Sequence, residues 1–81
     1  MSVVMIYCMH LHSLQPALMQ APISGALGDY ILKHISKPAW ALWIGEQTKL
    51  INEGRLKPHQ AESKIFLRSK MCEFFHINEE N

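Results

Sequence analysis

The sequence predicts an α+β domain in which a short N-terminal two-stranded antiparallel ribbon packs on three α-helices. Two observations lead to this prediction. A run of β-branched and aromatic residues stands near the N-terminus, and apolar residues further along the chain recur at helical spacing. The chain has 81 residues, 48% of them hydrophobic and 19% charged, which is typical of one small globular domain over residues 1–81.

The ribbon is expected to begin with a strand at residues 3–9, Val-Val-Met-Ile-Tyr-Cys-Met. Residues 17–20 are expected to return as the second strand. Pro16 and Pro22 flank this piece and would keep it short and at an edge, because proline donates no hydrogen bond to a sheet. A two-stranded ribbon is marginally stable alone, so it should lie on helices.

The first two helices are indicated by their caps. A helix from about Gly25 to Ile35 follows Ser24, whose hydroxyl can accept a backbone N–H of the first turn. A second helix follows Ser36, tolerates Pro38 in its first turn and should end at Gly54. Its apolar stripe consists of Trp40, Trp43, Ile44, Gln47, Leu50 and Ile51. Both tryptophans are expected to anchor the core.

The third helix is expected over residues 58–76, opened by Pro58. The residues expected on its core side are Ala61, Ile65, Leu67, Met71, Cys72, Phe74 and Phe75. Cys72 is therefore interpreted as a packing residue. A disulfide with Cys8 would need Cα atoms within about 7 Å, and a reducing cytosol disfavours it.

Charge is spread unevenly along the chain. The net charge is +1, but residues 33–70 carry all eight Lys and Arg against three Glu, a local charge of +5. A solvated helix surface explains such a run. The alternative is a weak basic face for an anionic partner.

Residues 1–23 are uncharged and apolar, which can imitate a secretion signal. A signal needs a positively charged start, whereas the first basic residue here is Lys33. We therefore expect a cytoplasmic protein with reduced thiols. No apolar run approaches the ~20 residues of a membrane span, so no membrane partner is expected.

Cys8, His10 and His12 form a C-x-H-x-H spacing. If the strand continues, alternation puts all three side chains on one face, with neighbours about 7 Å apart. Nitrogen and sulfur ligands suit Fe(II), Zn or Cu. The alternatives are exposed histidines at an edge strand, and a Cys8 that either fills the core or acts as a redox thiol.

The middle of the chain carries a specific pattern. Gly-Ala-Leu-Gly at 25–28, Ile-Ser-Lys-Pro-Ala-Trp-Ala-Leu-Trp at 35–43 and Gln-Thr-Lys-Leu-Ile-Asn-Glu at 47–53 strongly resemble the bacterial Fe(II)-trafficking, oxidative-damage-protection family. Cys8 stands where that family has its N-terminal cysteine. The resemblance covers about residues 4–75.

The resemblance implies a small cytoplasmic, non-enzymatic protein that handles labile ferrous iron and protects iron–sulfur proteins from oxidative damage. Iron contact would be weak and exchangeable, with no tightly bound cofactor. Iron–sulfur proteins or their assembly machinery would be the partners of a monomer or weak homodimer. Asn52 and Glu53 either end the second helix as solvated residues or form part of an interaction surface.

The sequence contains none of the common enzyme motifs that would favour a different function. The sequence has no Gly-rich phosphate loop, no H-E-x-x-H and no serine nucleophile elbow, so no catalytic residue is assigned. One alternative function is a metal-free interaction module that binds a protein, or weakly a nucleic acid, through residues 33–70. Nucleic acid is the less expected ligand. A third interpretation is a thiol redox buffer at Cys8.

Overall fold

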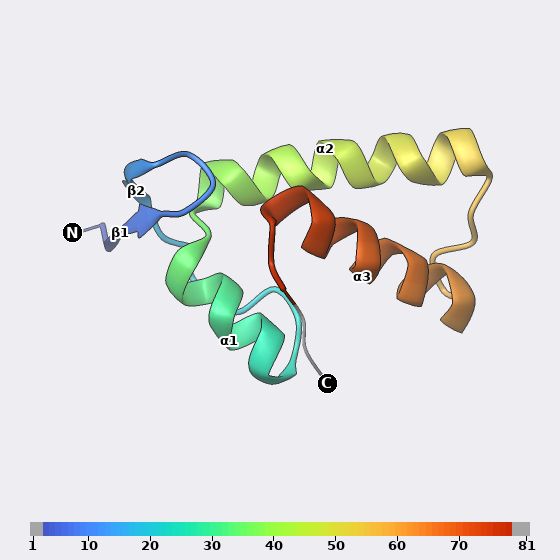
Figure 1. The fold of residues 1–81 in the computed structure, drawn as a ribbon, viewed down its shortest axis with the longest axis horizontal. Helices are drawn as coiled ribbons and strands as arrows, with labels where there is room; N and C mark the ends of the chain where they lie inside the picture. Colours follow the sequence, from blue (N-terminus) through green and yellow to red (C-terminus); the bar gives the residue numbers. More distant parts are fainter. Residues whose placement is uncertain (1–2, 79–81) are drawn as a thin grey trace. The chain divides into compact units, whose positions relative to one another are not determined.

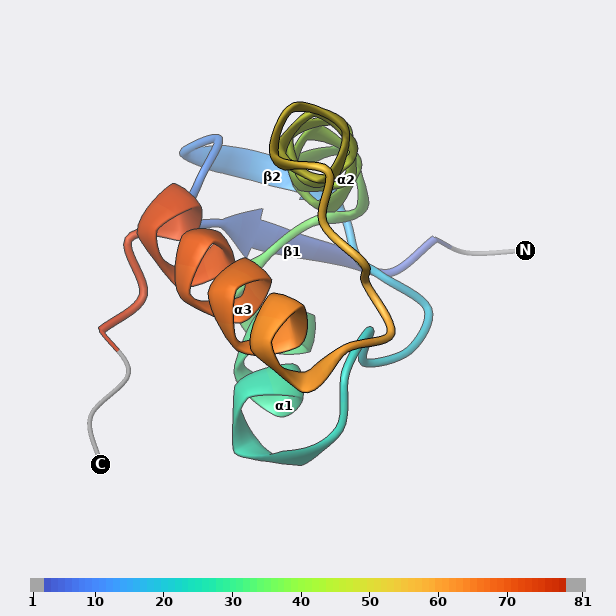
Figure 2. The ribbon, with the colours of Figure 1, turned by 90° about the vertical axis from the view of Figure 1, so that its right-hand side faces the viewer.

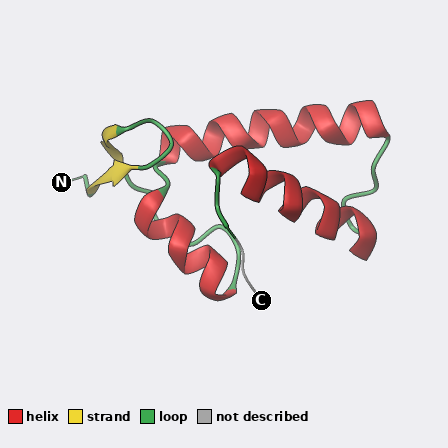
Figure 3. Cartoon of the chain, in the orientation of Figure 1, coloured by secondary structure: helices red, strands yellow, loops and turns green. Residues whose placement is uncertain are grey.

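The computed structural model describes residues 3–78 and confirms the predicted α+β class, with a two-stranded antiparallel sheet followed by three helices (Figure 1, Figure 3). The elements are β1 (Met5–Cys8), β2 (Ser13–Pro16), α1 (Gly25–His34), α2 (Lys37–Gly54) and α3 (Ala61–Phe75). The chain divides into two compact units at the Ala41–Leu42 bond within α2, and each unit is described by itself. One domain over residues 1–81 stays a prediction.

The sheet of the first unit is a short hairpin whose strands lie side by side (Figure 2). The paired residues are Met5 and Pro16, Ile6 and Gln15, Tyr7 and Leu14, and Cys8 and Ser13. Antiparallel pairs alternate between hydrogen-bonded and non-hydrogen-bonded. Pro16 falls at a non-bonded position, because the next bond along the ladder runs from the Ala17 N–H to the Val4 carbonyl, 2.8 Å.

The second strand lies at 13–16, so the expectation of residues 17–20 was wrong. The reason is a tight turn directly after β1. His12 takes a left-handed conformation, φ 54°, and its N–H donates to the Cys8 carbonyl, 2.8 Å. The chain therefore reverses over four residues and re-enters the sheet at Ser13. Of the expected strand, Ala17 makes only an isolated bridge to Ser36.

Helix α1 follows the predicted bounds closely. Its buried residues are Leu27, Gly28 and Ile31, and the Ile35 N–H closes the helix on the Ile31 carbonyl, 2.8 Å. Gly28 is required by a close approach, since a Cβ atom there would overlap the backbone carbonyl of Ile23. Ser24 is the N-cap residue, but its side chain makes no capping hydrogen bond.

The second unit contains the rest of α2 and all of α3. Trp43 is 1% exposed, and its ring stands 5.7 Å from that of Phe74, centroid to centroid. Phe74 in turn meets the Phe75 ring edge-on at 5.1 Å. The expectation that Trp43 anchors the core is confirmed, whereas Trp40 is half-buried.

The helix ends of this unit differ from expectation by a few residues. Gly54 is the last residue of α2, and Arg55 rather than glycine takes the left-handed conformation, φ 51°. Pro58 lies in the turn before α3 instead of opening the helix, which begins at Ala61 after the N-cap residue Gln60. α3 ends with His76 left-handed, φ 57°, as in a Schellman-type terminus.

The buried face of α3 also differs in part from expectation. Ser63, Leu67, Met71, Cys72 and Phe75 are buried, and four of these five recur at steps of four residues. Ile65 was expected on this face but is 70% exposed, because it lies two positions from both Ser63 and Leu67 and so projects from the opposite side. No helix within residues 3–78 is long and apolar enough to cross a membrane.

Candidate functional site

The candidate site is the thiol of Cys8, the last residue of β1. Cys8 is fully buried and is not in a disulfide. Ile6 and Cys8 share one face of the hairpin, while Met5 and Tyr7, half exposed or more, share the other. The alternation of β1 therefore directs the thiol away from the exposed face of the ribbon.

The first group around the thiol is Ser36, which stands between α1 and α2. Its backbone N–H donates to the Cys8 Sγ over 3.4 Å. Its hydroxyl oxygen accepts the Ala39 N–H over 3.3 Å, which makes Ser36 the N-cap of α2 as the sequence predicted. Ser36 is also fully buried. One residue therefore caps the helix and holds the sulfur at its N-terminal end, where the helix dipole favours negative charge.

These contacts favour the thiolate form of Cys8. Burial alone raises the pKa of the thiol, because the charged form loses hydration. Hydrogen bonds from the Ser36 side chain and from the backbone of Ser36, Leu11 and His10 act in the other direction. Together they hold the pKa of Cys8 below its ordinary value. The thiolate is the nucleophilic and metal-binding form of cysteine, so the site is prepared for either chemistry.

Met9, the residue after Cys8, is bound to α1 through both its backbone and its side chain. The Met9 N–H donates to the His34 carbonyl over 3.0 Å, and the Tyr30 hydroxyl donates to the Met9 Sδ over 3.3 Å. Tyr30 also stacks at a tilt on His34, with ring centroids 4.6 Å apart. These contacts position the turn whose backbone N–H groups face the sulfur. Because Cys8 is 0% exposed, a metal ion or oxidant reaches the thiol only if the residues around it move.

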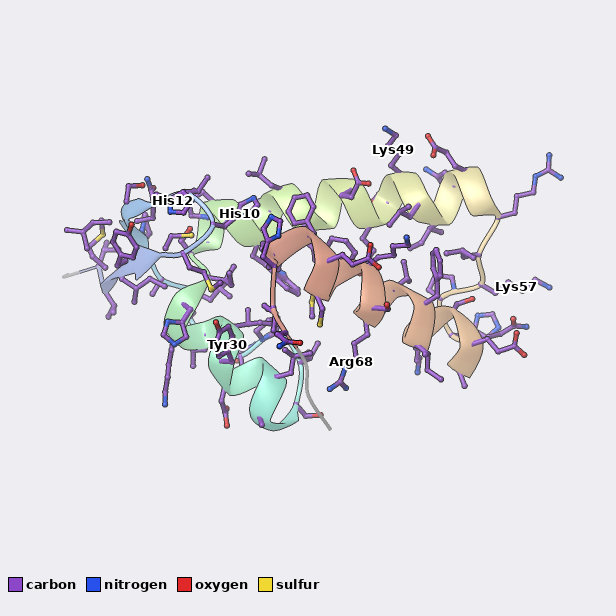
Figure 4. All side chains as sticks on the ribbon, in the orientation of Figure 1. His10, His12, Tyr30, Lys49, Lys57 and Arg68 are labelled. Carbon is purple, nitrogen blue, oxygen red and sulfur yellow. The ribbon has the colours of Figure 1, made fainter. Side chains whose placement is uncertain are left out.

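The two histidines predicted beside Cys8 lie in that turn and not in a strand (Figure 4). β1 ends at Cys8, so the alternation that would have aligned His10 and His12 with the thiol does not extend to them. His12 is exposed and left-handed, while His10 is half-buried. Among residues 3–78, no group of three or more His, Cys, Asp or Glu is placed to hold a metal ion. A shared site of Cys8, His10 and His12 stays a prediction.

The other predicted residues lie in the second unit. Cys72 is buried, 7% exposed, on the core face of α3 as expected, and it too is a free thiol. Asn52 and Glu53 are exposed on the last turn of α2. Their role as an interaction surface stays a prediction. Figure 4 shows Lys49 projecting from α2, Lys57 from the loop after it and Arg68 from α3.

Ser36 is the functional residue whose second role sequence reasoning missed. Its capping role was predicted from the residues that follow it, but a contact with a cysteine 28 positions earlier leaves no periodic signal in one sequence. The available signal was that Cys8 and Ser36 both fall on positions of the family pattern quoted above.

The fold and this site define a small α+β thiol protein, in which a buried cysteine at the end of a short strand is held by the N-terminus of a helix. Comparison with known proteins places it more narrowly. The chain matches the family described as "Bacterial Fe(2+) trafficking" over residues 1–81. It belongs to this bacterial Fe(2+)-trafficking family.

Several relatives named "Probable Fe(2+)-trafficking protein" align with most of the chain. A "Probable Fe(2+)-trafficking protein" of Halorhodospira halophila is 39% identical over 70 residues, 86% of this chain and 78% of the relative. The protein of that name from Pseudomonas putida is 48% identical over 60 residues, 74% of this chain and 67% of the relative. One from Xanthomonas oryzae is 38% identical over 69 residues, 85% and 75% of the two chains.

Proposed function

We propose that this protein binds Fe(2+) weakly and exchangeably through the Cys8 thiolate and passes it on, without enzymatic activity of its own. The observation that carries the proposal is the set of donors around Cys8 Sγ, which lowers the pKa of the thiol. Membership of the Fe(2+)-trafficking family supports iron as the cargo. Iron here is cargo and not a resident cofactor.

The surroundings of Cys8 argue for weak binding. Within residues 3–78 no group of three or more His, Cys, Asp or Glu is placed to hold an ion, so Cys8 is not part of a closed cage of ligands there. Water or a recipient protein would complete the coordination of the ion. Such an ion can be transferred readily, which suits trafficking. His10 and His12, which follow Cys8 in the turn, are the nearest candidates in sequence for a second ligand.

The cellular role follows from the same proposal. We propose that the protein acts in the cytoplasm, that it supplies iron to iron–sulfur proteins or their assembly machinery, and that it protects such proteins from oxidative damage. Asn52 and Glu53 on the exposed last turn of α2 are the proposed contact surface for these partners.

Anaerobic Fe(2+) titration by calorimetry tests the iron proposal. Wild type and Cys72→Ser should bind saturably, and Cys8→Ser should lose the binding while circular dichroism shows its fold intact. Cys72 is the matched control because it is the other buried free thiol. Equal binding by all three proteins, or binding by none, would overturn the proposal.

A second candidate function is favoured by the lowered pKa of Cys8. The thiolate would then attack peroxide to give the sulfenic acid and hydroxide, and two molecules of a small cellular thiol would restore it, leaving as their disulfide with release of water and with no metal involved. Mass spectrometry after peroxide treatment of metal-free protein tests it. Reversible oxidation at Cys8 faster than at Cys72 supports this function, whereas equal rates contradict it. The metal-free interaction module at residues 33–70 stays a prediction, and salt-sensitive binding to a polyanion would be its sign.

A further inference from the structure

We propose that two copies of this chain associate through the outer edge of β1, forming a four-stranded antiparallel sheet across a two-fold axis. The edge and the apolar face beside it carry the proposal. It does not rest on the proposed function, since Cys8 lies on the other face of the hairpin.

Within residues 3–78 the sheet contains two strands in the order β1–β2, so no strand pairs with the outer edge of β1 from Met5 to Tyr7. Just beyond the strand, the Met9 N–H on that same side donates to the His34 carbonyl, 3.0 Å, which limits the free edge to β1 itself. Val4 accepts the bond from Ala17 toward β2, and antiparallel ladders alternate. The backbone N–H and C=O groups of Met5 and Tyr7 therefore point to the outer edge. β2 is the poorer edge, because Pro16 lacks an N–H and Ala17 already bridges to Ser36.

The edge is short, four residues, but it lacks the charges and prolines that normally prevent strand pairing. Natural edge strands are protected by charged side chains, prolines or bulges. Residues 3–8 contain no charged residue and no proline, and the whole segment 1–23 contains no Lys, Arg, Asp or Glu. The face beside the edge is apolar as well: Val3 is 65% exposed, Met5 50%, Tyr7 58% and Leu14 66%.

A second copy is the occupant that these features fit. A charged partner would find no charge to pair with on this edge, whereas an identical strand offers the same uncharged apolar edge. The pairing is isologous, with Ile6 opposite Ile6 of the second copy and Met5 opposite Tyr7. In that register the outward N–H and C=O groups of Met5 and Tyr7 in both copies meet one another. The exposed side chains of both hairpins then form one continuous apolar face.

The area indicates how tight the association would be. The four exposed side chains present on the order of 400 Å², at the level where an apolar patch is often functional. A standard stable interface buries about 800 Å² per partner. The dimer should therefore be weak and should form as the protein concentration rises.

Sedimentation velocity over a concentration series up to about 1 mM tests the association. Wild type should shift from monomer to dimer. Tyr7→Lys should raise the dissociation constant at least about tenfold, because it puts two like charges at diagonal positions across the new pair. Ile65→Lys adds the same charge at a 70% exposed site on α3 and should leave the dissociation constant unchanged. A monomer at every concentration, or equal loss in both variants, would overturn the proposal.

Cross-linking tests the register without relying on charge. Hydrogen-bonded antiparallel pairs have Cα atoms about 5.5 Å apart, which is within disulfide range. A mixture of Met5→Cys and Tyr7→Cys should form a disulfide-linked dimer containing one of each chain. Each variant alone should cross-link at least about tenfold less, because positions 5 and 5, or 7 and 7, are only diagonal neighbours. Equal cross-linking in all three samples would overturn the proposed pairing.

Discussion

The backbone N–H of Ser36 donates to the Sγ of Cys8 over 3.4 Å, while the Ser36 hydroxyl oxygen accepts the N–H of Ala39 in the first turn of α2. One buried serine thus joins the end of β1 to the start of α2. The link ties the stability of the helix start to the protonation of the thiol.

Ser36→Ala should lower stability and raise the pKa of Cys8 together. Loss of an N-cap side chain costs about 1 kcal/mol, and the thiolate loses the serine side chain as a donor while keeping the backbone N–H. Urea unfolding measures the first effect, and the pH dependence of Cys8 alkylation measures the second.

Ser24→Ala is the matched control for that variant. Ser24 occupies the N-cap position of α1, but its side chain makes no capping hydrogen bond. Its removal should change the free energy of unfolding by no more than about 0.5 kcal/mol and leave the Cys8 alkylation profile in place. Similar losses from both serines would show that the Ser36 contacts contribute nothing particular.

The free energy of unfolding should rise with pH through the titration range of Cys8. The folded state lowers the pKa of this thiol, so the folded protein binds the proton less tightly than the unfolded chain does. The resulting stability is fully present above the unfolded-state pKa, about 8.5, and is lost as the pH falls through the lower folded-state value. Urea unfolding at a series of pH values measures the slope. Cys8→Ser should abolish it, and a slope unchanged in that variant would refute the assignment.

Two glycine substitutions should shift stability in opposite directions. Gly28→Ala places a Cβ atom on the Ile23 carbonyl, so α1 or the preceding segment must move, at a cost of about 1–3 kcal/mol. Gly45→Ala lies inside α2 with nothing within 4 Å of the new atom, and should stabilise the protein by about 0.5–1 kcal/mol. Thermal unfolding of the two variants gives the signs. A stabilising Gly28→Ala would show that this approach of backbones is not as close as described.

The aromatic contact of the second unit should show coupling beyond simple burial. Trp43→Ala should cost about 3–5 kcal/mol, because the side chain is 1% exposed. A double-mutant cycle of Trp43→Leu with Phe74→Leu should give a coupling of about 0.5–1.5 kcal/mol, in line with ring centroids 5.7 Å apart. Additive effects of the two changes would mean that the rings do not interact in solution.

The sequence predicted the fold class and the helices well, because caps and apolar spacing are local signals. Ser36 and Trp43 illustrate this, whereas Ile44 of the expected α2 stripe is 40% exposed. The second strand was misplaced because a left-handed His12 closes the turn, and histidine gives little local indication of that conformation. Ile65 was assigned to the wrong side of α3 because it lies at helical spacing from Ala61 and Cys72. Spacing alone does not tell which of two overlapping apolar faces of a helix is buried.

The site was predicted only in part. Cys8 was identified by its place in a family pattern and by its chemistry. Its partner Ser36 was not, because a contact between residues 28 positions apart depends on the tertiary fold. The alignment of His10 and His12 with the thiol depended on a strand that ends at Cys8. The extent of a strand is set by where its partner strand returns, which short-range patterns do not determine.

The proposed function depends above all on the Cys8 thiolate binding ferrous iron. X-ray absorption at the iron edge identifies the ligands of the ion, on anaerobic samples with the protein in excess over Fe(2+). We expect one sulfur ligand to iron in wild type and in Cys72→Ser, and only oxygen and nitrogen ligands in Cys8→Ser. Iron surrounded by oxygen and nitrogen alone in all three proteins would contradict this expectation.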